Sequence, residues 1–312
     1  MKYNWAASAN IYSSTLVDLA LKNKDIFVVE ADLMKASGTR IFKDKFPDRH
    51  INVGVAEQNL VGISAGLAAM GRIPFAFAMA NFISQRACDQ VTISVSYNNF
   101  NVKLVGGFAG LSQGKNGGTH ISIMDIAIIR NLPNVKILVP SDSIELSYVL
   151  SAALNDFGPT YIRMSRFIGE NIFDRSYKFE IGKIYQIGNG KDLTIASTGI
   201  STVITLKALD LLNKEGINAR LIHIPTIKPI DSDLIIKCAK ETGLVITVED
   251  HSISGGLGGL ITEILSETYP VPIFRIGLEN KFGLTADLEF QLDYFGISVE
   301  NILRIAKKIL KK

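Results

Sequence analysis

The feature that most constrains the fold of this chain is a regular alternation of short apolar runs with longer amphipathic segments. Short apolar runs suit strands that are buried on both faces of a parallel sheet, and the segments between them have the period of surface helices. In the first part of the chain we expect strands at residues 26–30, 50–55, 102–105, 135–139 and 161–164 and helices at 57–70, 124–130 and 143–155. This order predicts βαβ units and a mostly parallel sheet.

The pattern loosens at residues 173–190, where Gly188-Asn189-Gly190 and other breakers interrupt it, and then starts again. The second part predicts strands at 193–197, 219–224, 244–249 and 273–276 and helices at 202–215, 233–242, 257–266 and 298–310. With 312 residues, the chain is long enough for two domains of ordinary size. We therefore predict two tandem α/β domains, at residues 1–172 and 191–312, joined by a linker at 173–190.

Composition is useful mainly for what it excludes. The formal charge of +3 is spread along the sequence, so we expect no nucleic-acid partner. No run of about 18 apolar residues suits a membrane span, and the first residues do not resemble a signal peptide. Cys88 and Cys238 fit no metal-binding spacing and are expected as buried free thiols, while His50, His223 and His251 are expected to be structural. We therefore expect a cytoplasmic protein that contacts no membrane.

Glu57 follows the strand predicted at residues 50–55 and begins the helix predicted at 57–70. A glutamate in the first turn of a helix is often explained by the helix dipole alone. Here the helix also has small residues that let another backbone approach closely, at Gly62, Ala65, Gly66 and Ala69. Such an approach would enclose the carboxyl group, and an enclosed carboxyl group can share a proton with a ring nitrogen.

Two further stretches combine aromatic residues or glycines with polar residues. Phe75 and Phe77 alternate along a strand and are expected in the core, whereas Phe82 lies at a strand-to-helix junction, where its ring could stack on a planar ligand. The six glycines between Gly106 and Gly118 are incompatible with a regular helix or strand. They predict a loop whose backbone lies against a ligand and which ends at His120.

In this order and spacing, these stretches resemble the pyrimidine-binding domain of transketolases. The matching motifs are GVAEQN at residues 54–59, a PF…F…RA.DQV run at 74–91, a GGTH segment ending at His120, and VPSD at 139–142. The resemblance covers roughly residues 26–166. The region 193–259 is similar to the C-terminal domain of the same family.

The resemblance implies roles for single residues. Glu57 matches the glutamate that binds the N1′ nitrogen of thiamine diphosphate and activates this cofactor, and Phe82 matches the aromatic residue that stacks on its pyrimidine ring. The segment Asp32-Leu33 matches a segment that lies against the cofactor. His120 matches a histidine that contacts the sugar substrate, and Arg166 matches an arginine that binds the substrate phosphate.

The resemblance also implies that the chain is the C-terminal, beta-like subunit of a split transketolase. Such an enzyme transfers a two-carbon ketol unit between sugars or sugar phosphates through a carbanion of thiamine diphosphate. The family binds the diphosphate and its Mg²⁺ or Ca²⁺ with a Gly-Asp-Gly…Asn motif, and no Gly-Asp-Gly occurs in this sequence. We therefore expect an N-terminal partner subunit that carries this motif and the metal, an assembly with two copies of each chain, and no metal ligand in this chain.

Three positions depart from the family pattern. Asn116, which is expected to face the substrate, stands where the family usually has an aspartate. Phe108 stands at the position of a histidine, and Ala9 at the position of an arginine that helps to hold a sugar phosphate. The loss of these polar groups predicts weaker recognition of an ordinary ketose phosphate and favours a modified or branched sugar.

Three alternatives remain open. The chain could belong to a decarboxylating relative such as 1-deoxyxylulose 5-phosphate synthase, although that enzyme is normally one long chain. It could be the beta chain of a 2-oxo acid dehydrogenase, which an assay with a lipoyl domain would distinguish. It could also be a non-catalytic assembly subunit, but the presence of Glu57, Phe82 and His120 argues against this.

Overall fold

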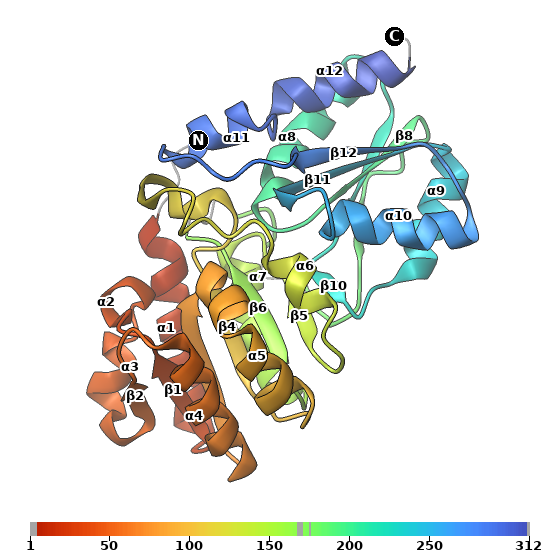
Figure 1. Cartoon of the computed structure of the whole chain (residues 1–312). Coiled ribbons are helices and arrows are strands. Elements are labelled where there is room, and N and C mark those ends of the chain that lie inside the picture. Colours follow the sequence, from red (N-terminus) through yellow and green to blue (C-terminus); the bar gives the residue numbers. More distant parts are fainter. Residues whose placement is uncertain (1–4, 167–170, 175, 311–312) are drawn as a thin grey trace.

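The computed structural model describes residues 5–166, 171–174 and 176–310. It contains two β-sheets, and each sheet is covered by helices on both faces (Figure 1). The predicted fold class, two tandem α/β units with mostly parallel sheets, is confirmed. In the described part of the chain, no helix combines the length and the apolar character that crossing a membrane requires.

The first sheet has seven strands in the order β10-β5-β6-β4-β3-β1-β2. They are β1 (Ile26–Glu30), β2 (His50–Asn52), β3 (Ile73–Met79), β4 (Lys103–Gly107), β5 (Lys136–Leu138), β6 (Thr160–Met164) and β10 (Thr226–Lys228). Strands β1 to β6 pair in parallel, as the alternating pattern predicts. Strand β10 comes from the second half of the chain and pairs antiparallel with β5, which the sequence analysis did not predict.

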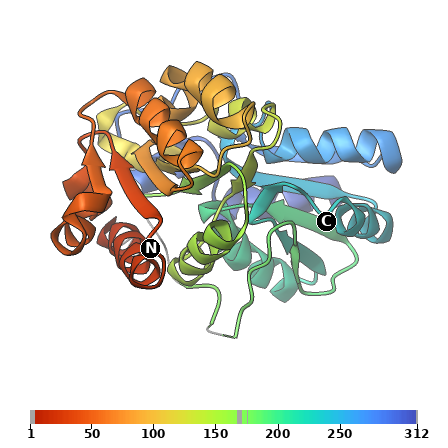
Figure 2. The same cartoon turned by 90° about the horizontal axis from the view of Figure 1, so that it is seen from below.

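Helices cover both faces of the first sheet. One face carries α1 (Trp5–Lys22) and α7 (Ser143–Asn155), which lie side by side (Figure 2). The other face carries α4 (Glu57–Ala69) and α6 (Asp125–Arg130). The short helices α2 (Met34–Ser37), α3 (Arg40–Lys45) and η1 (Pro47–Arg49) connect β1 to β2. Successive side chains of β3 alternate between the faces, so Phe75 and Phe77 are fully buried beneath α1, as expected.

The segment after β3 is a helix with wide turns. It consists of η2 (Phe82–Arg86), α5 (Cys88–Gln90) and η3 (Val91–Ser96), of which η2 and η3 have π-helical hydrogen bonding. Such π-turns occur frequently at functional sites because they change the direction in which side chains point. Phe82 is the first residue of η2.

The second sheet has five strands in the order β12-β11-β8-β9-β7. They are β7 (Tyr185–Ile187), β8 (Leu193–Ser197), β9 (Ala219–His223), β11 (Val245–Ser252) and β12 (Ile273–Leu278). One face packs on α8 (Ile200–Lys214), α11 (Leu288–Tyr294) and α12 (Val299–Leu310), and the other on α9 (Ser232–Thr242) and α10 (Leu257–Thr268). Strand β7 lies inside the segment expected as a linker and pairs antiparallel with β9.

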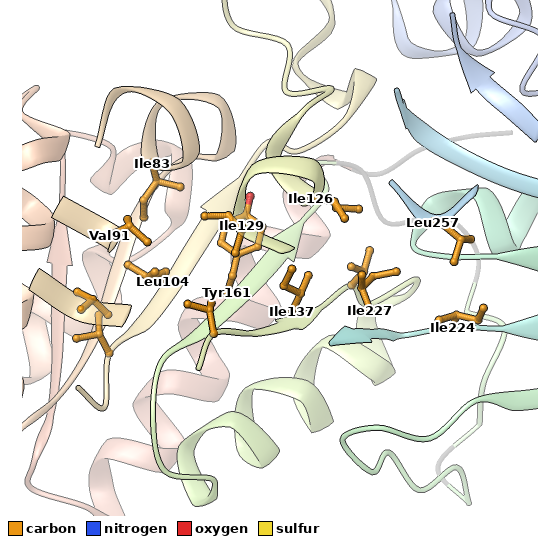
Figure 3. Packing of buried hydrophobic residues seen from close by; sticks show 14 of the residues in the cluster. Ile83, Val91, Leu104, Ile126, Ile129, Ile137, Tyr161, Ile224, Ile227 and Leu257 are labelled. Carbon is orange, nitrogen blue, oxygen red and sulfur yellow. The ribbon is translucent and has the colours of Figure 1, made fainter. Parts of the chain in front are cut away.

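The two halves of the molecule share one hydrophobic cluster. Ile126 and Ile137, from the first half, belong to the same cluster of buried residues as Ile224, Ile227 and Leu257 from the second half (Figure 3). Because apolar surface buried between the halves stabilises both, this cluster joins the two sheets, although α1 and α7 cover a separate cluster on the other face of the first sheet.

A buried ionic network also joins the two halves. The Arg163 guanidinium, in β6, donates from Nε to Oδ2 of Asp125 at 2.9 Å and from Nη1 to Oδ1 of Asp250, in β11, at 2.8 Å. Tyr161 donates its hydroxyl to the same Asp125 oxygen at 2.8 Å. Burial raises the pKa of Asp125, but the charge of Arg163 lowers it, and the pKa remains below its ordinary value. Arg163 therefore forms ion pairs with carboxyl groups from both halves.

The expected linker is held against both halves by a second polar cluster. His223, in β9, lies with Nε2 2.9 Å from Oε1 of Glu145 in α7, and Tyr177 donates its hydroxyl to the same oxygen at 2.6 Å. The other ring nitrogen of His223 lies 2.9 Å from the hydroxyl of Thr202. This hydroxyl–imidazole–carboxylate order occurs in hydrolases, but His223, Glu145 and Thr202 are all fully buried here. The group therefore joins elements and has no access to a substrate.

We predict that Arg163→Met lowers the free energy of unfolding by about 3–5 kcal/mol, because it leaves two buried carboxyl groups without their cation. Urea denaturation followed by circular dichroism would measure this change. The control is Arg72→Met, which breaks an ion pair with Asp25 whose side chains are 45% and 47% exposed. That change should cost at most about 1 kcal/mol. Equal losses in the two variants would contradict the role given to Arg163.

Glu249 and His251, near the end of β11, titrate abnormally and in opposite directions. Burial raises the pKa of Glu249 to about 7, even though its carboxylate accepts hydrogen bonds from the N–H groups of Leu257 and Gly258 at 2.7 Å. Burial lowers the pKa of His251 to about 4. Nδ1 of His251 lies 3.8 Å from Oε2 of Glu249.

These shifts predict opposing effects of pH on stability. From pH 4.5 to about 7, the folded chain keeps the Glu249 proton that the unfolded chain has released, so Glu249 makes the free energy of unfolding fall as pH rises. From about pH 4 to 6.5, the unfolded chain holds a His251 proton that the folded chain lacks. His251 therefore makes the free energy of unfolding rise as pH rises. The prediction concerns the slope of the free energy of unfolding against pH, measured by denaturation from pH 4 to 7.5. We expect this slope to be more negative than in wild type for His251→Gln and more positive for Glu249→Gln. Unchanged slopes would contradict the shifts.

Candidate active site

The predicted site residues lie at one edge of the first sheet. Asp32-Leu33 follow β1, Glu57 follows β2, Phe82 follows β3, and Arg166 follows β6. The glycine-rich loop leaves the end of β4 at the same edge. Because β1, β2, β3, β4 and β6 are parallel, their carboxyl ends meet there, and this is the edge where ligands of open α/β sheets bind.

Glu57 is a buried carboxylate with an exposed cation beside it. It is the first residue of α4 and is only 2% exposed. Nη1 of Arg86 donates to Oε2 of Glu57 at 2.8 Å, and the side chain of Arg86 is 47% exposed. Among the residues that the structure describes, Arg86 is the one side chain that donates to Glu57. The other carboxylate oxygen, Oε1, is therefore available to a ligand.

Phe82 lies between Arg86 and His120. The guanidinium carbon of Arg86 is 4.2 Å from the centroid of the Phe82 ring. The ring of His120 meets the ring of Phe82 edge-on, with centroids 5.2 Å apart and an angle of 73° between the planes. Asn81, next to Phe82, donates to the backbone oxygen of Thr119 at 2.7 Å and so ties the end of the loop to η2. The structure thus brings Glu57, Phe82 and His120 together.

Arg86 was not singled out as a site residue from the sequence. It lies about one helical turn after Phe82, in the same RA.DQV motif. This spacing is the signal that could have identified it, because side chains four residues apart on a helix lie near each other.

Arg166 lies at the same edge, in a recess that it lines together with Ser8, Ala9, Ala36, Phe108 and Met164. Its guanidinium carbon is 5.6 Å from the ring centroid of Phe108. Ser8 donates its hydroxyl to the backbone oxygen of Arg166 at 2.6 Å. Two of the departures from the family pattern, Ala9 and Phe108, therefore line the recess that holds Arg166.

Asp32 and Asn116 are more peripheral. Asp32 has a φ of 57°, a left-handed conformation that aspartate tolerates better than most residues, and its N–H donates to Oδ1 of Asn52 at 3.0 Å. Asn116 is exposed at the end of η4 (Leu111–Asn116). No hydrogen bond within the described part of the chain joins Asp32 or Asn116 to Glu57.

In the described residues, no three His, Cys, Asp or Glu side chains are placed to bind a metal ion. Both cysteines are free thiols. Cys238 is buried as expected, whereas Cys88 is only half-buried, because it lies in the short helix α5 at the surface of the sheet.

Comparison with known proteins places this geometry in a family. The model of the transketolase pyrimidine-binding domain matches residues 6–169, and the model of the transketolase C-terminal domain matches residues 182–302. The chain belongs to the transketolase family. It is 39% identical, over 96% of its length and 94% of the relative, to "6-deoxy-6-sulfo-D-fructose transketolase subunit SqwH" from Clostridium sp. (strain MSTE9).

Another relative of this transketolase chain is also named as a subunit, and a similar solved structure comes from a split gene. It is 34% identical, over the full length of both chains, to an apulose-4-phosphate transketolase subunit from Phocaeicola vulgatus. Among solved structures it resembles a "Split gene transketolase, inactive beta4 tetramer", with a TM-score of 0.90, 37% identity, and coverage of 97% of this chain and 98% of the other.

The transketolase family uses thiamine diphosphate, and the residues of this chain fit the pyrimidine half of that cofactor. The buried carboxylate of Glu57 has one oxygen that Arg86 does not occupy, which suits a protonated ring nitrogen. The half-buried ring of Phe82 suits stacking against an aromatic heterocycle. Arg86 covers part of this ring, but its exposed side chain can move aside.

Proposed function

We propose that this chain is the C-terminal subunit of a split transketolase and that, with an N-terminal partner subunit, it transfers a two-carbon ketol unit between sugars. The observation that carries the proposal is the convergence of Glu57, Phe82 and His120 at the carboxyl edge of the first sheet. We further propose residues 1–172 and 191–312 as its pyrimidine-binding and C-terminal domains, with 173–190 as the linker.

When bound, thiamine diphosphate supplies the electron sink that stabilises the two-carbon unit during its transfer. Glu57 would hold a hydrogen bond to the N1′ nitrogen of the bound cofactor and so assist proton transfer there. The ring of Phe82 would stack on the pyrimidine, and Asp32-Leu33 would border it. His120, whose ring meets that of Phe82, contacts the hydroxyl or carbonyl end of the sugar.

Exposed apolar side chains on α4, which Glu57 begins, and on the neighbouring η3 support the need for a partner subunit. Val55, Met70, Ile93 and Tyr97 are 72%, 77%, 57% and 81% exposed on α4, η3 and the adjoining turns, which pack next to each other. Large exposed apolar side chains on neighbouring helices are typical of interfaces between proteins. We propose that the partner covers this face, carries the Gly-Asp-Gly…Asn motif and holds the diphosphate with Mg²⁺ or Ca²⁺, in an assembly with two copies of each chain.

The recess around Arg166 supports a substrate other than the common ketose phosphates. Besides Arg166 and Ser8, its lining consists of Ala9, Ala36, Phe108 and Met164, whose side chains offer no N–H or O–H donor. A dianionic phosphate needs several donors to replace its hydration. We therefore propose a modified or branched sugar; the names of two relatives mention 6-deoxy-6-sulfo-D-fructose and apulose 4-phosphate.

We predict that Glu57→Gln lowers kcat/KM for ketol transfer by about 10²–10⁴ in the complex with the N-terminal subunit, because the variant loses a positioned acid–base group. Coupled spectrophotometric assays would measure the loss, and circular dichroism would verify the fold. The control is Glu267→Gln, at an exposed position of α10, which should leave the rate unchanged. Near-normal turnover by Glu57→Gln would overturn the role of Glu57. Tight cofactor uptake and turnover by this chain alone would overturn the need for a partner.

For the substrate, we predict that kcat/KM for xylulose 5-phosphate and ribose 5-phosphate is at least about tenfold lower than for a sulfonated or branched ketose donor, the scale of one lost hydrogen bond to a charged group. The double variant Ala9→Arg, Phe108→His should raise kcat/KM for the ketose phosphate, because it returns a cation and an imidazole to the recess. Wild-type turnover of the ordinary sugar phosphates at full transketolase efficiency would refute this assignment. Transfer from pyruvate instead of a ketose would favour the decarboxylating alternative.

A further inference from the structure

The glycine-rich loop that carries Asn116 and His120 rests on the second half of the molecule. In Figure 1 the yellow loop lies next to the blue segment that leads into α11. A Cβ atom on Gly117 would lie 2.7 Å from the hydroxyl of Thr285, and one on Gly118 would lie 2.8 Å from the backbone oxygen of Gly283. These glycines are therefore required by the close approach of residues 283–286, and not only by the turn of the loop.

A single buried amide, that of Gln291 in α11, joins the loop to this segment. Gln291 is a polar residue, yet it is fully buried, together with Leu288 and Leu292 of the same helix. Its Nε2 donates to the backbone oxygens of Leu111, at the start of η4, at 3.4 Å and of Ala286 at 3.3 Å. Its Oε1 accepts from the N–H of Leu284 at 2.9 Å. One side chain thus satisfies backbone groups of both the loop and residues 284–286.

The part of the loop after η4 depends on such contacts because few backbone hydrogen bonds hold it. Residues 111–116 form the 3-10 helix η4, and beyond it Gly117 donates to the backbone oxygen of Gly114 at 3.2 Å and His120 donates to that of Gly117 at 3.0 Å. Gly114 and Gly117 both have positive φ angles, which an isolated chain adopts among many other conformations. At its far end the loop is tied by Asn81 to η2. The position of His120 is therefore determined from both halves of the molecule.

We propose that Gln291 is a positioning residue for the reaction: with residues 283–286, it holds the glycine-rich loop so that His120 stays beside Phe82 and Asn116 faces the substrate. This inference rests on the proposed function. It assigns to the C-terminal domain a part in substrate binding that acts through Leu111 and the loop, without contact between Gln291 and the sugar.

The test uses Gln291→Met, which keeps the length of the side chain and removes its hydrogen bonds. In the chain alone, hydrogen–deuterium exchange at the amides of Gly117 and His120 should speed up by about tenfold, the scale of one lost buried hydrogen bond. In the complex with the N-terminal subunit, KM for the donor sugar should rise by a similar factor, while the affinity for thiamine diphosphate should change by less than about twofold. A residue with a merely structural role would not separate these two constants.

Two further variants guard against misfolding and general destabilisation. Gly118→Ala disturbs the same contact from the loop side, because its Cβ meets the oxygen of Gly283, and it should give the same pattern if Gln291→Met does not fold. Asn301→Leu is the control. It removes a hydrogen bond to the oxygen of Gly296 at 2.7 Å in the same half of the molecule, away from the loop, and should change neither loop exchange nor donor KM.

The outcomes separate this inference from the proposed function. Unchanged loop exchange in folded Gln291→Met would overturn the anchoring of the loop, whatever the activity. Faster exchange with an unchanged donor KM would overturn the positioning role. A wild-type complex without ketol transfer would refute the proposed function, and the exchange measurement on the chain alone would still decide whether Gln291 anchors the loop.

Discussion

The ionic contacts of Arg163 hold the two halves of this molecule in one arrangement. Its guanidinium group binds Asp125 from the first half and Asp250 from the second, and none of these groups is accessible to water. Buried charges are tolerated only when an opposite charge is held close to them, so the contacts of Arg163 restrict how the sheets meet. Asp250 also packs against Gly110, in the glycine-rich loop. The same network therefore contacts the loop at the edge of the sheet where the candidate site lies.

This arrangement explains why the candidate site belongs to both halves, although its chemical groups come from the first. Glu57, Phe82 and His120 follow strands of the first sheet, but the loop that carries His120 packs on residues 283–286 of the second half. The shared hydrophobic cluster and the pairing of strand β10 with β5 also join the two halves. A movement between the halves would therefore displace His120 relative to Glu57.

In the proposed function, this chain supplies the pyrimidine side of the cofactor site. Glu57 and Phe82 suit the pyrimidine, and each begins a helical segment, α4 or η2-α5-η3, along which large apolar side chains such as Met70 and Ile93 are exposed. The proposed division of the active site between two chains is consistent with this exposed apolar surface.

Patterns within short segments of the sequence predicted the alternation of strands and helices and the family, and they singled out Glu57, Phe82 and His120. The edge of the sheet at which these residues meet follows only once the strands are known to be parallel, because their carboxyl ends then lie together. Only the tertiary structure decided that Arg86 pairs with Glu57, that residues 226–228 join the first sheet, and that Gln291 holds a loop 180 residues before it. Such contacts depend on packing between distant segments, which leaves no periodic trace in the sequence.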